Sequence, residues 1–191
     1  MDLVAEDVRE QVFQDREAHI LHACENYRGL TVRCFPSSIW DETLYRAWSQ
    51  IVYCLVPNTK LLEDNLGEFC RLCGADEVVL FESTTFLVIA HCEDKREGRV
   101  THGDVHRFEK ISNIIKQFKL SCRKAQSQFD GMMVSNSQFA SFFNIFTSNT
   151  CIMVIVSDSR VEPEAVQLNI EGARAHFDSI IPQSTSAASS S

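Results

Sequence analysis

One long amphipathic segment lies between two groups of short apolar segments, and this order limits the fold more than any other feature. Residues 105–129 carry apolar side chains at helical spacing, which predicts a helix with one buried stripe. The stripe consists of Phe108, Ile111, Ile115, Phe118, Cys122 and Phe129. Two apolar runs precede this segment and three follow it, with short polar turns between the runs of each group. Short turns join antiparallel strands, so we expect one antiparallel sheet.

The apolar runs and their flanking segments give the order α-β-β-α-β-β-β-α. The predicted strands are residues 77–82, 85–92, 131–135, 139–146 and 150–157. Two further helices are predicted over residues 60–73 and from Pro163 to about residue 177. This order predicts an α/β (α+β) fold in which a five-stranded antiparallel sheet lies between helices. The long helix should cover one face and the two flanking helices the other.

The first 57 residues do not complete a domain of this kind. Their pattern predicts a helix over residues 5–27, a strand over 30–35 and a second helix from Asp41 to about residue 56. One strand cannot form a sheet, and each large apolar side chain left exposed would forfeit about 1.5–3 kcal/mol of burial. We therefore expect residues 1–57 to be the end of a larger α/β domain. Residues 58–180 should form a second domain, and residues 181–191 a disordered Ser-rich tail.

Composition excludes several functional classes. The net charge is −8 and no basic stripe is available to neutralise phosphates, which argues against a nucleic-acid partner. No apolar run is long enough to span a bilayer, so direct membrane insertion is not expected. Eight cysteines occur without a secretory signal, which is typical of reduced thiols in a cytosolic protein. Cys54 and Cys151 lie within apolar runs and are expected in the core.

The sequence contains few groups that could carry chemistry. Neither a Gly-x-x-x-x-Gly-Lys-Ser/Thr phosphate loop nor a Gly-x-Ser-x-Gly motif occurs. Cys70 and Cys73 form a metal-like pair, but a structural zinc site needs a second pair of ligands. His91 alternates with apolar strand residues, which favours a core histidine. We therefore assign no catalytic or metal-ligating residue, and a metal-dependent or thiol enzyme remains an alternative that rests on Cys70 and Cys73.

Three stretches resemble the Rag GTPases of the A/B class. The run Ser-Ile-Trp-Asp-Glu-Thr-Leu-Tyr at residues 38–45 resembles the end of that family's G domain. Residues 75–89 are similar to the start of its C-terminal domain. The most specific match is Asp-Val-His-Arg-Phe-Glu-Lys-Ile-Ser-Asn-Ile-Ile-Lys-Gln-Phe-Lys-Leu-Ser-Cys at residues 104–122. The resemblance covers roughly residues 1–180 and implies a roadblock-type or longin-like fold for residues 58–180.

The same resemblance implies part of a guanine site in residues 1–57. The last two positions of the guanine-reading motif would fall on Met1 and Asp2, and Asp2 would accept hydrogen bonds from the base. Ser38 and Ile39 would belong to the loop near the base. The full-length family binds GTP or GDP and hydrolyses GTP. This chain lacks the family's phosphate loop, switches and magnesium ligands, so we expect no bound nucleotide and no activity in isolation.

For partners, the resemblance implies a heterodimer with a RagC/D-type GTPase through the roadblock-type domains. That dimer would dock on the Ragulator scaffold and signal amino-acid sufficiency to the TOR kinase complex. The expected location is the cytoplasm and the cytosolic face of the lysosome, with the nucleus as a further possibility. The predicted dimer interface lies on the outer face of the long helix and on the strand after it, at Asn113, Gln117, Leu120, Met132 and Val134. The alternative is a nucleotide-free roadblock or longin-type adaptor in trafficking or motor complexes.

Overall fold

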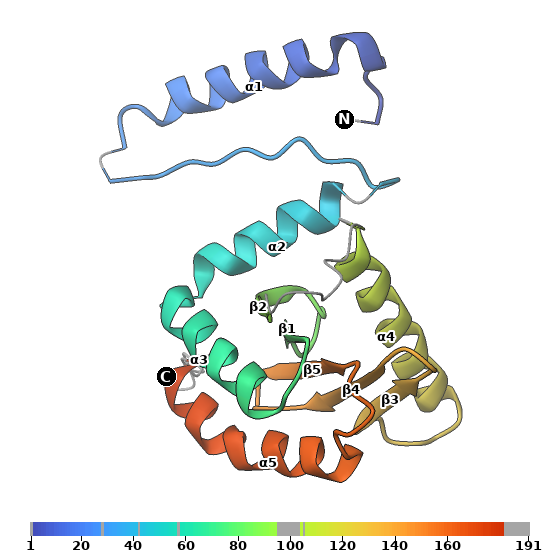
Figure 1. Ribbon diagram of the computed structural model, residues 1–191. Coiled ribbons are helices and arrows are strands. Elements are labelled where there is room, and N and C mark those ends of the chain that lie inside the picture. The colour runs from blue at the N-terminus through green and yellow to red at the C-terminus, as the bar shows by residue number, and fades with distance from the viewer. Residues whose placement is uncertain are drawn as a thin grey trace, which may run out of the picture. The chain divides into compact units, whose positions relative to one another are not determined.

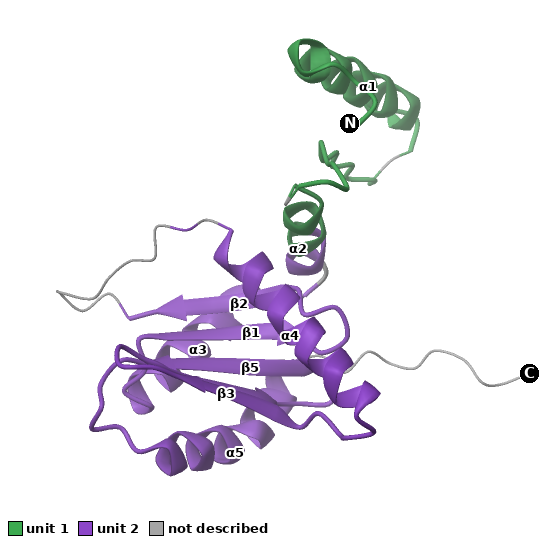
Figure 2. Ribbon diagram, turned by 90° about the vertical axis from the view of Figure 1, so that its right-hand side faces the viewer, with its two compact units in different colours: residues 1–50 green, residues 51–191 purple. Residues whose placement is uncertain are grey.

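The chain divides into two compact units. The computed structural model describes residues 2–27, 29–41, 43–56, 58–94, 104 and 106–181. The first unit comprises Met1–Gln50 and the second Ile51–Ser191, coloured separately in Figure 2. The domain boundary expected after residue 57 stays a prediction. The tail expected from residue 181 falls almost wholly outside the described residues.

The first unit is mostly helical. It contains a short 3-10 helix at Glu6–Val8, helix α1 at Arg9–Cys24 and the beginning of helix α2, which spans Thr43–Leu55. Residues 30–38 link α1 to α2 without strand pairing, so the predicted strand over residues 30–35 is wrong. A strand needs a neighbour for its N–H and C=O groups, and the described part of this unit supplies none. Helix α1 buries none of its side chains.

The second unit is built on one five-stranded sheet in the order β2-β1-β5-β4-β3. The strands are β1 Glu77–Glu82, β2 Val88–Glu93, β3 Gly131–Ser135, β4 Ala140–Ile145 and β5 Thr150–Val156. Every neighbouring pair is antiparallel, which confirms the predicted sheet. Strands β2 and β3 form its two edges.

Helices cover both faces of this sheet, as expected. Figures 1 and 2 show α4, which spans Arg107–Lys124, on one face. Helices α3 at Thr59–Leu72 and α5 at Pro163–Ile180 lie on the other. Each face has its own buried cluster. Phe177 packs against Phe69 and Phe146 under α3 and α5, with ring centroids 6.2 and 5.0 Å apart. Phe143 packs against Phe81 and Phe86 beneath α4, at 5.9 Å in both cases.

Helix α4 ends earlier than its apolar stripe suggested. The helix stops at Lys124, and Gln126 adopts a left-handed conformation with φ of 55°. A left-handed residue just past the last turn ends a helix, here without glycine. Phe129 therefore lies outside the helix, although its ring still stacks on Phe143 at 6.0 Å. Phe118, expected in the core, is 44% exposed.

Strand β2 begins at Val88, three residues later than expected. The carboxylate of Glu82 accepts hydrogen bonds from the backbone N–H groups of Thr84 and Thr85, at 2.9 and 2.6 Å. Phe86 has φ of 55°, yet its side chain is buried. This turn uses residues 83–87 to reverse the chain, so they are not available to the strand.

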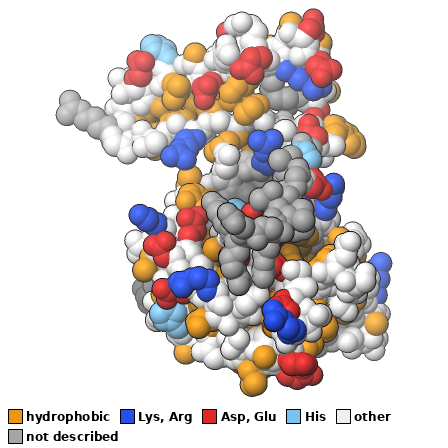
Figure 3. Space-filling view, in the orientation of Figure 1, with side chains coloured by type: hydrophobic (Ala, Val, Ile, Leu, Met, Phe, Trp, Pro, Cys, Tyr) orange, Lys and Arg blue, Asp and Glu red, His pale blue; other side chains and the backbone are white. Residues whose placement is uncertain are grey.

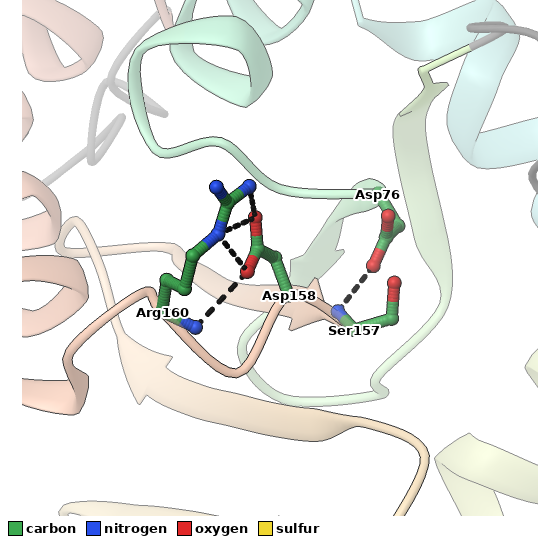
Figure 4. Close-up of polar contacts among 4 residues, drawn as sticks. All are labelled: Asp76, Ser157, Asp158 and Arg160. Atoms are coloured by element: carbon green, nitrogen blue, oxygen red, sulfur yellow. Dashed lines mark hydrogen bonds and ion pairs between the residues drawn. The ribbon is translucent and has the colours of Figure 1, made fainter.

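A polar turn connects β5 to α5 (Figure 4). The Asp76 carboxylate accepts a hydrogen bond from the Ser157 N–H group, which ties the start of β1 to the end of β5. The Asp158 carboxylate binds the guanidinium of Arg160 with Nη2–Oδ2 at 2.7 Å and Nε–Oδ1 at 3.0 Å. Pro163 then occupies the first turn of α5, where its fixed φ suits a helix start.

Two expectations about individual side chains need correction. His91 is exposed rather than buried, because it lies on the edge strand β2; its ring meets the Phe108 ring of α4 edge-on, with centroids 5.1 Å apart. Cys54 is also exposed, whereas Cys151 is buried as expected. All eight cysteines lie in the described residues, and no disulfide joins any of them. None of the helices in the described ranges is long and apolar enough to cross a membrane.

Candidate functional site

Asp2 and the loop at Ser38 come together in the first unit. The Ser38 hydroxyl donates a hydrogen bond to Asp2 Oδ1, and the Ile39 N–H group donates to Asp2 Oδ2 at 3.3 Å. The Trp40 N–H group donates to Ser38 Oγ at 3.0 Å, and Ser38 N–H donates to Thr43 Oγ1 at 2.8 Å. The loop is thereby tied both to Asp2 and to the first turn of α2. Three residues assigned to the guanine base thus lie side by side, although 36 positions separate Asp2 from Ser38 in the chain.

This arrangement keeps Asp2 ionised. The hydrogen bond from Ser38 lowers the pKa of the Asp2 carboxyl, and the bond from the Ile39 N–H group acts in the same direction. The side chains of Ile39 and Trp40 are 70% and 82% exposed. An exposed carboxylate beside apolar side chains can accept hydrogen bonds from the N–H edge of a planar base. The assignment of Asp2, Ser38 and Ile39 stays a prediction, and Met1 lies outside the described residues.

The second candidate site is the β3 edge of the sheet. Among the described residues, strand β3 pairs with β4 alone, so its other side presents an open backbone edge. Met132 is partly buried against the cluster beneath α4, and Val134, two residues further on, is 45% exposed on the same face of the sheet. Met133 is 53% exposed. The strand therefore combines an open hydrogen-bonding edge with apolar side chains.

Helix α4 presents an exposed apolar flank next to this edge. Phe118 touches Phe129, which lies two residues before β3, with ring centroids 5.9 Å apart. Ile114 lies one turn earlier on the same side of the helix and is 58% exposed. We call Ile114, Phe118 and Val134 the β3-side apolar patch. Helical periodicity assigns Phe118 to the core and does not single out Ile114. The periodic pattern identifies the apolar stripe of the helix, but it does not show how wide the sheet beneath the helix is.

The helix residues predicted for the interface are exposed, but they do not all lie beside β3. Asn113, Gln117 and Leu120 are exposed, with Leu120 at 38%. Leu120 lies about 200° around the helix from Phe118. The Lys119 ammonium group lies over the Phe86 ring, with Nζ 5.0 Å from the ring centroid. Leu120 therefore lies on the outer flank of α4, away from β3. The interface assignment stays a prediction, and the geometry favours Ile114 and Phe118 over Leu120 as its helical part.

Catalytic or metal chemistry finds little support in the described residues. Within them, no group of three or more His, Cys, Asp or Glu side chains could hold a metal ion. Cys70 and Cys73 are buried, and burial raises the pKa of the Cys73 thiol to about 11, which leaves it protonated. On the face shown in Figure 3, acidic and basic side chains are interspersed rather than gathered into a basic stripe.

Comparison with known proteins identifies the sequence family. The family model described as the Gtr1/RagA G protein conserved region matches residues 1–115. The chain is 56% identical over 181 residues to Ras-related GTP-binding protein A of Dictyostelium discoideum, covering 95% of this chain and 58% of that protein. It is 52% identical over 180 residues to Ras-related GTP-binding protein B of Rattus norvegicus, covering 94% and 46%. The chain thus spans about half the length of these relatives.

The fold comparison agrees with the predicted class. The MglB protein of Myxococcus xanthus superposes with a TM-score of 0.51 at 13% sequence identity, covering 62% of this chain and 92% of that one. At this identity the match concerns the fold alone. The antiparallel sheet and its helix layers confirm the expected α/β roadblock-like fold of the second unit.

Proposed function

Because the chain belongs to the Gtr1/RagA family of G proteins, we propose that it is the C-terminal part of a RagA/B-type GTPase that pairs with a RagC/D-type partner. In this proposal the second unit is the pairing domain. The first unit contributes the end of a G domain, including residues that contact the guanine base. The GTP-binding relatives in Dictyostelium and rat support this assignment.

The observation that carries the pairing proposal is the β3 edge with its apolar patch. An open strand edge is a template for a strand of another chain. Exposed apolar side chains near it gain free energy when they are covered. Ile114 and Phe118 on α4 and Val134 on β3 are such side chains. A partner with the same roadblock-type architecture could add its own edge strand and pack its own helix against this patch.

Family membership supports a proposal for the wider cellular role. We propose that the pair docks on the Ragulator scaffold at the cytosolic face of the lysosome and signals amino-acid sufficiency to TOR complex components. The nucleus is a further possible location. In this view, protein partners bring the chain to the membrane.

Nucleotide control in this proposal belongs to the full-length protein. GTP or GDP would contact Asp2, Ser38 and Ile39 through the base. The 191 residues contain no phosphate-loop motif. Base contacts without phosphate contacts should give affinity weaker than micromolar, and 1 μM corresponds to about −8 kcal/mol.

A pairing experiment tests the proposal directly. The chain is mixed with a purified RagC/D-type roadblock-type domain, and the mass of the complex is measured by size-exclusion chromatography with light scattering. The proposal expects a one-to-one complex. A roadblock-type domain from an unrelated adaptor serves as the specificity control. Failure to form a complex at tens of micromolar, or equal binding to the control domain, would contradict the proposal.

A further inference from the structure

Two carboxylates share one guanidinium nitrogen where α4 begins. Arg107 Nη2 contacts both Glu77 Oε1 of β1 and Glu93 Oε1 of β2. The two glutamates are directly paired across the antiparallel strands. The Arg107 guanidinium also lies over the Phe108 ring, with Cζ 4.6 Å from the centroid. The cluster therefore fastens the first turn of α4 to two strands of the sheet.

This cluster is buried and unbalanced in charge. The side chains of Glu77 and Arg107 are 3% and 14% exposed, and that of Glu93 is 31% exposed. Two negative charges facing one positive charge leave a net charge of −1. Oε2 of Glu77 and Nη1 of Arg107 are both buried, and neither has a hydrogen-bond partner among the described residues. A buried carboxylate with an unpaired oxygen and a second carboxylate beside it binds a proton more tightly than a free one.

Few other described charged groups face the cluster. His91 of β2 interacts electrostatically with both Glu93 and Arg107. On β5 the residue opposite Glu77 is Ile155, which carries no charge. One turn along α4, Lys110 is paired with Asp104 at 2.7 Å. None of these groups supplies the second positive charge that would balance the two carboxylates.

We propose that Glu77, Glu93 and Arg107 form a one-proton switch, such that the folded chain is more stable when the carboxylate pair holds a proton than when both carboxylates are ionised. Uptake of one proton by the carboxylate pair changes the net charge of the cluster from −1 to 0. The proton belongs to the pair rather than to one residue, because the two carboxylates interact. This inference does not depend on the proposed function of the chain.

The linkage between proton binding and folding gives the direction in which folding stability changes with pH. Burial raises the pKa of Glu77 to about 7 from its ordinary value of 4.5, with Glu93 adding to the rise and Arg107 opposing it. The folded state therefore holds this proton more tightly than the unfolded state, so stability increases as the pH falls through the folded pKa. Between pH 8 and pH 6 the folding equilibrium constant should rise about tenfold from this group. Carboxyl groups whose pKa is lowered in the folded state have the opposite effect on stability, which they reduce as the pH falls, and this effect occurs at lower pH.

The decisive experiment is a carboxyl-carbon NMR titration of Glu77 in the full chain. The switch predicts a midpoint near pH 7, which should fall in Glu93→Gln and rise in Arg107→Gln. A wild-type midpoint below about pH 5.5 would overturn the proposal, as would variants that leave the midpoint unchanged. Urea unfolding of wild type and Glu77→Gln gives a second measurement. The ratio of their folding constants should change about tenfold between pH 8 and pH 6, and a constant ratio would contradict the switch.

Discussion

The ring of Phe118 in α4 meets the ring of Phe129, just before β3, edge-on at 5.9 Å and 67°. This contact places one flank of α4 beside the open edge of the sheet. Ile114 lies one turn earlier on that flank, whereas Leu120 lies on the outer flank. The helix face suited to a partner that pairs with β3 is therefore the Ile114 side.

The first prediction compares charge on these two flanks. Ile114→Glu should weaken association with a RagC/D-type roadblock-type domain at least tenfold, about 1.4 kcal/mol, because it places a charge in a desolvated contact. Leu120→Glu is the matched control and should leave the affinity unchanged. Both sites are exposed, so circular dichroism should show a folded protein in each case. If Leu120→Glu weakens binding and Ile114→Glu does not, the partner covers the outer face instead.

The second prediction concerns the core beneath α4. Phe143 is 1% exposed and contacts Phe81, Phe86 and Phe129. Phe143→Ala should destabilise the second unit by about 3–5 kcal/mol, because it removes burial and leaves a cavity. Urea unfolding followed by circular dichroism measures this loss. A loss below about 1 kcal/mol would show that the cluster does not hold the helix on the sheet.

The third prediction tests the close approach of β3 to β4. A Cβ added at Gly131 would lie 2.8 Å from the Phe143 carbonyl oxygen and 2.8 Å from Asn144 Oδ1. The backbone carbonyl cannot move away without disturbing the strand pairing, so Gly131→Ala should cost about 1–3 kcal/mol. Gly172→Ala is a suitable control, since among the described residues its added Cβ would meet nothing within 4 Å apart from its own helix backbone and chain neighbours, and alanine favours the helix. Equal stability of the two variants would show that the strands adjust freely.

The fourth prediction concerns the Asp2 carboxyl. The Ser38 hydroxyl is the largest cause of its lowered pKa, so Ser38→Ala should raise that pKa towards its ordinary value. NMR titration of the carboxyl carbon measures the change. Asp41 provides an internal control, because its pKa is lowered mainly by Thr43. An unchanged Asp2 titration would mean that the Ser38 contact does not persist in solution.

The sequence predicted the second unit well because its signals are local. Apolar runs separated by polar turns define strands wherever both faces are covered, and β1 and β5 are of this kind. The predicted ends of helices and strands were less accurate where the backbone conformation of a single residue determines the end. The left-handed Phe86 precedes the start of β2, and the left-handed Gln126 follows the end of α4, although the apolar pattern extends past both residues.

The candidate sites were less predictable from sequence. Helical periodicity places Phe118 in the same stripe as Ile115, yet Ile115 is fully buried whereas Phe118 is 44% exposed and meets Phe129. The residues near Asp2 were found through family resemblance, since no spacing rule links Asp2 to Ser38. The charge cluster at Arg107 was not predicted at all. Its three members are separated by 14 to 30 positions, and only the paired strands bring them together.

Amide hydrogen exchange of β3 tests the central claim most directly. The backbone exchange rates of Gly131–Ser135 are compared in the free chain and in the presence of a saturating RagC/D-type roadblock-type domain. The account predicts slower exchange in this strand on binding, because its open edge gains hydrogen bonds from the partner's strand. Binding with unchanged exchange in β3, and protection only in α3 and α5, would contradict it.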